Sequence, residues 1–158
     1  MANSAEYQVL LALKAALEEI TVANSYNTDV QLVELYEKFA DQRPVFPCIA
    51  IAEIGTTEDQ TRFGEKNEVT MTVVLSCAIE TYTNEHELVG EFVADIKKRL
   101  FADLPTFLPS ITGGGSRLIT VERTERVHST EEDPRAGADI FLSILFRHPI
   151  DDPYTLTP

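Results

Sequence analysis

The stretch VTMTVVLSCAI, residues 69–79, decides the fold of this 158-residue chain. Apolar residues stand at every second position of this stretch, and threonine, serine or alanine occupies most of the positions between them. Such alternation is typical of a β-strand with one face in a hydrophobic core and the other face near water. We therefore expect a long antiparallel strand here, with the rest of the fold built against its apolar face.

A second strand is expected at residues 48–54, directly before the first. Pro44 and Pro47 precede it, and proline prevents a helix from continuing because it lacks the backbone donor and restricts the residue before it. The two strands are expected to pair as a hairpin with a long arm. The segment between them, residues 55–67, is polar and has the composition of a loop.

Two segments have the apolar period of amphipathic helices. The first is residues 4–20, for which Ser4 is a candidate N-cap. The second is residues 85–101, which follows Asn84 as its cap. Its last turn contains the basic residues 97–99, which suit the partial negative charge at the C-terminus of a helix.

Three further strands are expected at residues 28–36, 118–124 and 138–147, although the first of these could also form a helix. The resulting order favours an α+β fold, with two helices packed on one face of a mostly antiparallel sheet of four to five strands. We expect residues 1–147 to form a single domain and residues 148–158 to form an extended C-terminal tail.

The charge of the chain limits its partners. The sequence contains 26 Asp and Glu residues against 13 Lys and Arg residues, a formal net charge of −13. Tight binding to nucleic acid requires cations that neutralise phosphates, so this class of function is disfavoured. Docking on an anionic membrane is disfavoured for the same reason, although DNA can still pass close to an acidic surface.

Two further observations concern the cellular location. No apolar run approaches the roughly 20 residues that a membrane-spanning helix needs, and residues 1–6 lack the basic start of a secretory signal. Cys48 and Cys77 both lie in apolar strand-like runs and are expected to be buried, reduced thiols. The expected site of synthesis is the cytoplasm.

The sequence contains no motif of a catalytic or cofactor-binding site. The glycines at 113–115 lack the ending of a phosphate-binding loop, and His86, His128 and His148 are scattered singly. The acidic run at 131–133 has no spacing that indicates a calcium site. We therefore expect neither an enzyme nor a protein with a metal or a cofactor.

Contacts with other proteins are expected in three segments. Arg62 and Phe63 place an aromatic ring beside a cation in the polar segment 55–67, a combination that suits an interface anchor. Phe107 and Leu108 lie among the prolines after the second helix, where they either cap the core or face a partner. Arg117 ends the glycine-rich segment that precedes the fourth strand.

The order of these features is similar to that of a known family. A leading amphipathic helix is followed by RPVFPCIAI at residues 43–51, by the strand 69–79 and by the helix at 85–100. The last strand, DIFLSILFRHP at residues 139–149, then runs into DDP at 151–153. Together these features resemble the tail-terminator, or tail-completion, proteins of long-tailed bacteriophages.

The resemblance implies a structural virion protein at the head-proximal end of the tail, synthesised in the host cytoplasm. Such a protein forms a homohexameric ring that caps the tail tube, ends its polymerisation and joins it to the head connector. Its expected partners are its own copies, the tail tube protein and the head–tail connector protein, and no membrane. An anionic lumen would let DNA pass without tight binding, and Glu58, Asp59, Glu131 and Glu132 are our candidates to line it.

Three alternatives remain open from the sequence. The chain could be another neck or head-completion protein of the head–tail junction. It could also be a small hydrolase with dispersed carboxylates, or an adaptor that docks peptides on an edge strand.

Overall fold

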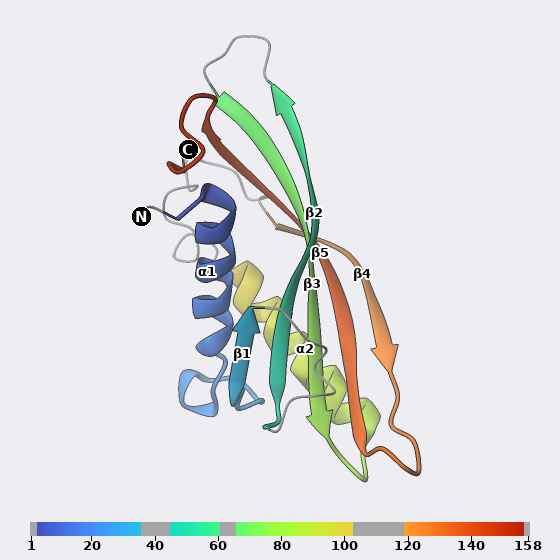
Figure 1. Cartoon of the computed structure of the whole chain (residues 1–158). Helices are drawn as coiled ribbons and strands as arrows, with labels where there is room; N and C mark the ends of the chain where they lie inside the picture. Colours follow the sequence, from blue (N-terminus) through green and yellow to red (C-terminus); the bar gives the residue numbers. More distant parts are fainter. Residues whose placement is uncertain (1–2, 36–44, 61–65, 103–118, 157–158) are drawn as a thin grey trace.

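The computed structural model describes residues 3–35, 45–60, 66–102 and 119–156 (Figure 1). These residues form an α+β fold with two α-helices and one five-stranded sheet, as the sequence predicts. The elements are α1 (Ala5–Glu18), a 3-10 helix (Val22–Asn24), β1 (Leu32–Leu35), β2 (Cys48–Gln60), β3 (Lys66–Glu80), α2 (Glu85–Ala102), β4 (Ile119–Val127) and β5 (Arg135–Pro149).

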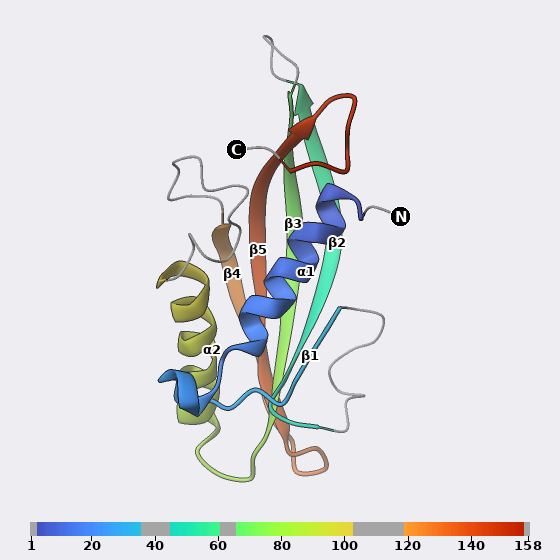
Figure 2. The ribbon, with the colours of Figure 1, turned by 90° about the vertical axis from the view of Figure 1, so that its left-hand side faces the viewer.

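The strands lie in the order β1-β2-β3-β5-β4 across the sheet. All neighbours are antiparallel except β1 and β2, which run parallel. Residues 28–36 were expected to form either a strand or a helix, and the strand is confirmed over Leu32–Leu35. Both helices pack on the same face of the sheet, as expected, because their buried residues share one core with it. Figure 2 shows α1 in front of the strands and α2 beside β4.

β3 is the centre of the sheet, and its pattern is the one predicted. Its apolar positions from Val69 to Ile79 face the helices and are buried, and the strand pairs along its whole length with β5. The hydrophobic core fills the space between this face and the two helices. Its largest fully buried side chains include Leu13, Leu17, Met71, Leu75, Phe92, Ile96, Ile140 and Phe146.

The prediction of a loop over residues 55–67 is wrong at both ends of this segment, which are strand. β2 continues to Gln60 and β3 already begins at Lys66, so the hairpin arm is longer than predicted. The polar residues of β2 form a strand because each pairs with a residue of β3, from Gly55 with Thr72 to Gln60 with Asn67. Pairing with a regular neighbouring strand therefore overrides their loop-like composition.

α1 begins as expected after Ser4, whose side chain accepts a hydrogen bond from the Tyr7 amide at 3.3 Å. This bond satisfies one of the amides that the first helical turn leaves unpaired. The helix buries Val9, Leu13 and Leu17 against the sheet. It ends at Glu18, two residues before the expected boundary.

The C-terminal residues differ from the expected extended tail. β5 includes residues 148 and 149, and residues 150–156 turn back towards α1 (Figure 1). The Ala5 amide donates to the Pro153 carbonyl at 2.8 Å, and the Gln8 side chain donates to the Tyr154 carbonyl at 2.6 Å. These bonds hold the end of the chain against the first helix because they satisfy polar groups there.

Candidate interaction surface

The face of the sheet opposite the two helices has no described helix packed on it (Figure 1). At the end of this face where β2 begins and β3 ends, Cys48, Ala50 and Ala78 pack together and are buried. Leu32 and Phe46 contact this cluster and are partly buried. We call this side of the sheet the outer face.

Polar side chains on the outer face are paired with one another. The Ser76 hydroxyl donates to Asp139 at 2.7 Å, across β3 and β5. Towards the hairpin arm, Arg147 donates to Glu68 at 2.8 Å. Such cross-strand pairs stabilise a sheet face without a second layer.

A hollow of about 450 Å³ lies at the end of the outer face that is nearest to the β4–β5 connection. Ala78 and Gly137 are among its lining residues, and Asp133, Arg135 and Asp139 supply its charges. Asp133 and Arg135 form an ion pair at 2.5 Å, so their charges largely neutralise each other. After this pair, the Asp139 carboxylate remains, so the hollow is a shallow, weakly negative surface rather than a strongly charged pocket.

The hairpin arm is acidic. Glu53, Glu58 and Asp59 lie on the part of β2 beyond β1, and Glu68 lies on β3 beside them. The Glu58 carboxylate accepts a hydrogen bond from the buried Asn67 side chain at 2.5 Å. Burial raises the pKa of Glu53, and the negative charge of Glu6 on α1 raises it further.

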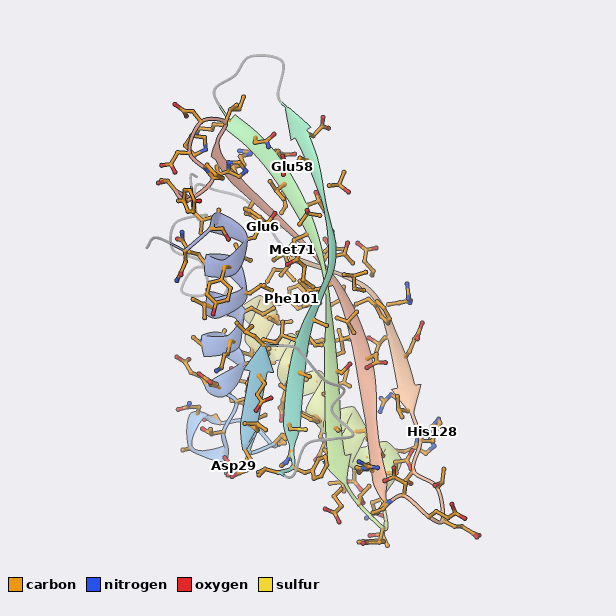
Figure 3. All side chains as sticks on the ribbon, in the orientation of Figure 1. Glu6, Asp29, Glu58, Met71, Phe101 and His128 are labelled. Atoms are coloured by element: carbon orange, nitrogen blue, oxygen red, sulfur yellow. The ribbon has the colours of Figure 1, made fainter. Side chains whose placement is uncertain are left out.

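The structure does not bring the four candidate lumen residues together. Glu58 and Asp59 lie on the arm, whereas Glu131 and Glu132 lie in the β4–β5 connection at the other end of the sheet. In Figure 3, Glu58 marks the first end, and His128, close to the β4–β5 connection, marks the second. The two acidic pairs are separated by about 11 residues of β3, or roughly 37 Å at the usual rise of a strand.

The five candidate interface residues lie outside the described residues. They are Arg62, Phe63, Phe107, Leu108 and Arg117.

A polar cluster joins the start of α2 to the end of β4. The Glu85 carboxylate accepts hydrogen bonds from the Ser129 hydroxyl at 2.5 Å and the Ser129 amide at 3.1 Å, and it contacts Nδ1 of His128 at 2.6 Å. These bonds lower the pKa of Glu85 to about 2. The Ser129 hydroxyl is directed to the carboxylate rather than to the imidazole, so this is not the arrangement of a nucleophile and its base.

The Glu85 cluster predicts a specific dependence of stability on pH. The folded-state pKa of Glu85 lies below its ordinary value of 4.5, so its stabilising effect is present above pH 4.5 and is lost as the pH falls towards about 2. We expect Glu85→Gln to be less stable than the wild type at pH 6, and the difference to shrink as the pH falls through this window. Urea unfolding at several pH values measures it.

Glu87→Gln is the matched control, because Glu87 is an exposed carboxylate in the same helical turn. It should unfold like the wild type at every pH. If the difference in stability between wild type and Glu85→Gln stayed constant from pH 6 to pH 2.5, the titration of Glu85 would not be linked to folding.

Sequence reasoning missed two charged residues that α2 buries. Asp95 is 3% exposed and accepts hydrogen bonds from the amides of Asn27 and Thr28 at 2.9 and 2.7 Å. Arg99 was expected to act at the helix end, but it is buried and donates to the Ala16 carbonyl at 2.9 Å. Their burial could have been predicted from their spacing. Asp95 and Arg99 follow Phe92 by three and seven residues, which places both on the apolar stripe of the helix.

The fold and this surface define the class of the protein as an α+β chain with one helix-covered and one outer sheet face. Within the described ranges, no group of three or more His, Cys, Asp or Glu side chains is placed to hold a metal ion. None of the described helices has the length and apolar character to span a membrane. The chain matches no protein-family model, and no curated protein is significantly similar to it in sequence.

Proposed function

We propose that the chain is a structural subunit of a bacteriophage tail terminator. In this proposal, copies of the chain form a ring, most simply a hexamer, at the head-proximal end of the tail tube. The ring ends tube polymerisation and presents a surface to the head–tail connector protein. The function is structural rather than catalytic.

The observation that carries the proposal is the hairpin arm with its outer face. β1 pairs only with Cys48–Ile51, so the rest of β2 is a sheet edge without a partner among the described strands. Unpaired strand edges and uncovered sheet faces favour association with other chains. A ring needs two different contact surfaces on each subunit, and the arm and the body of the sheet supply two.

The two acidic ends of the sheet support the passage of DNA. If the strands run along the ring axis, Glu58 and Asp59 lie near one opening and Glu131 and Glu132 near the other. Both openings then carry carboxylates that repel the phosphate backbone. DNA therefore passes through the ring without tight binding.

Light scattering tests the proposal. The purified chain is measured over a concentration series, alone and with purified tail tubes. We expect a defined ring, or its formation when tube ends are present. The proposal would be contradicted if the chain stayed monomeric in every condition.

A neck protein of the same head–tail junction is distinguished by what the chain binds. Co-sedimentation with tail tubes supports a terminator. Binding to purified head portals without binding to tubes supports a neck protein instead.

A further inference from the structure

The sequence of β4 contains a pattern that the proposed ring does not use. Residues 121–127 have the sequence VERTERV. When two copies of this segment run antiparallel, the charges of one are complementary to those of the other. About its central residue, Thr124, each glutamate comes opposite an arginine and each valine opposite a valine. Arg123 meets Glu125, and Glu122 meets Arg126.

The fold exposes this segment. β4 is the last strand of the sheet, and no described strand pairs with its other side. The side chains of Arg123 and Glu125 are 58% and 56% exposed, and they form an ion pair with each other at 2.7 Å. Arg123 also stacks on the ring of Phe141 at 3.6 Å, which places this pair on the outer face.

Arg126 extends to the opposite side of the sheet. Its guanidinium lies 3.9 Å from the place where Gly90 of α2 would carry a Cβ. It is exposed and makes no ion pair with any residue that the structure describes. An arginine at a free sheet edge without an acidic partner can pair with a carboxylate of another chain.

We propose that β4 pairs with β4 of a second copy, antiparallel, about a two-fold axis through Thr124. Between Arg123 and Glu125, where β4 is regular, residues opposite each other in such a ladder share one face of the sheet. On the outer face, Arg123 and Glu125 of both copies then form a square of alternating charges. Next to this square, the residue of the second copy opposite Arg126 is Glu122, which lies at the β-bulge and supplies a carboxylate to the exposed guanidinium.

Charge selects this pairing over self-pairing of the other sheet edge. The unpaired part of β2 carries Glu53, Glu58 and Asp59 and no basic residue among residues 53–60. Two such edges repel each other, and like charges directly opposite destabilise a sheet. β4 carries two cations and two anions, so in a chain of net charge −13 its self-pairing avoids that repulsion.

Thr124 supplies a second, independent observation. Its hydroxyl oxygen is buried and has no hydrogen-bond partner among the described residues. On the two-fold axis it comes opposite Thr124 of the second copy. After rotation about χ1 the two hydroxyls can bond to each other, as paired threonines do across strands.

This contact is isologous, whereas the contacts that close a ring are heterologous. The inference therefore goes beyond the proposed function. It assigns the β4 contact to a dimer of the unassembled chain.

Charge reversal tests the pairing. Wild-type protein should have twice the 17.6 kDa monomer mass in sedimentation equilibrium. Arg123→Glu and Glu125→Arg should each weaken the dimer at least about tenfold, because each places like charges opposite each other. Mixing these two variants should produce a heterodimer, because every cross-strand pair is then again of opposite charge. The double variant Arg123→Glu/Glu125→Arg should also dimerise.

The controls reverse the same charges away from β4. Lys14→Glu on α1 and Glu91→Arg on α2 are expected to leave the dimer mass unchanged. Circular dichroism confirms that each variant is folded. Loss of dimer in both single variants without recovery in the mixture would overturn the pairing.

Cysteine cross-linking locates the axis. Thr124→Cys should form an intermolecular disulfide under mild oxidation, because residues opposite each other across the axis have Cα atoms about 5 Å apart. Thr120→Cys should not, because its two copies lie roughly 25 Å apart. Burial raises the pKa of the native Cys77 thiol to about 12, which keeps it protonated and unreactive. Cross-linking of Thr120→Cys in place of Thr124→Cys overturns the register.

The outcomes separate this inference from the proposed ring. A free hexamer whose mass neither charge reversal alters would overturn the β4 dimer and leave the ring standing. Dimers that neither cap tail tubes nor form rings on them would support β4 pairing and contradict the ring. Monomer under all conditions contradicts both.

Discussion

Gly137→Ala is expected to destabilise the protein by about 3 kcal/mol or more, or to prevent folding. Gly137 lies in β5 opposite Ala78 of β3, at the most extensively paired interface of the sheet. A Cβ at this position would lie 1.9 Å from the backbone carbonyl oxygen of Cys77 and 3.1 Å from the Ala78 Cα. These atoms belong to a central strand, so the methyl group can fit only if the β3–β5 ladder separates.

Gly55→Ala is the matched control, because Gly55 also lies in the sheet and a Cβ there would have no atom within 4 Å. It is expected to be neutral or to stabilise the fold by up to about 1 kcal/mol, because alanine has less freedom in the unfolded chain. Urea unfolding measures both variants. Equal stabilities of Gly137→Ala and wild type would show that the two strands are less closely packed than the structure indicates.

Asp95→Ala is expected to lower the free energy of unfolding by about 2–4 kcal/mol. The Asp95 carboxylate accepts the amides of Asn27 and Thr28 and also contacts the Asn27 side chain at 3.4 Å. Alanine leaves these donors unpaired in a partly buried place, so the segment between α1 and β1 loses its attachment to α2. Thermal unfolding should show a midpoint lower by roughly 5–15 °C.

Two further variants identify the cause of the Asp95 effect. Asp95→Asn keeps one acceptor oxygen and should recover part of the loss. Glu91→Ala, one turn earlier on the exposed side of α2, should stay within about 0.5 kcal/mol of the wild type. If Asp95→Ala were as stable as Glu91→Ala, the carboxylate would not hold the segment.

The central strand and the two helices could be predicted because their signal is local. The alternation at residues 69–79 and the apolar stripes of both helices depend only on which residues face the core. The α+β class follows from these elements and their order, and the structure confirms it.

The other features depend on contacts between distant segments. The polar residues of β2 beyond Ile54 are strand because β3 pairs with them, and composition does not reveal a partner. Asp95 and Arg99 looked like ordinary polar residues of a helix, yet each satisfies backbone groups more than 60 positions away in the sequence. The turn at residues 150–156 similarly depends on α1.

The candidate site was harder to predict than the fold. A list of acidic residues gives no direction in space, and Glu58 and Glu131 lie at opposite ends of the sheet. By contrast, the self-complementary charges of β4 could be found in the sequence. They indicate a contact between two copies only because the topology places that strand at an edge of the sheet.

Tail tubes polymerised in vitro provide the most direct test of the proposed function. Tube protein is assembled with increasing amounts of the labelled chain, and tube lengths and label positions are measured by electron microscopy. We expect the tubes to become shorter as the chain is added, with a ring of label at one end. Tubes of unchanged length, with label absent or spread along their sides, would contradict it.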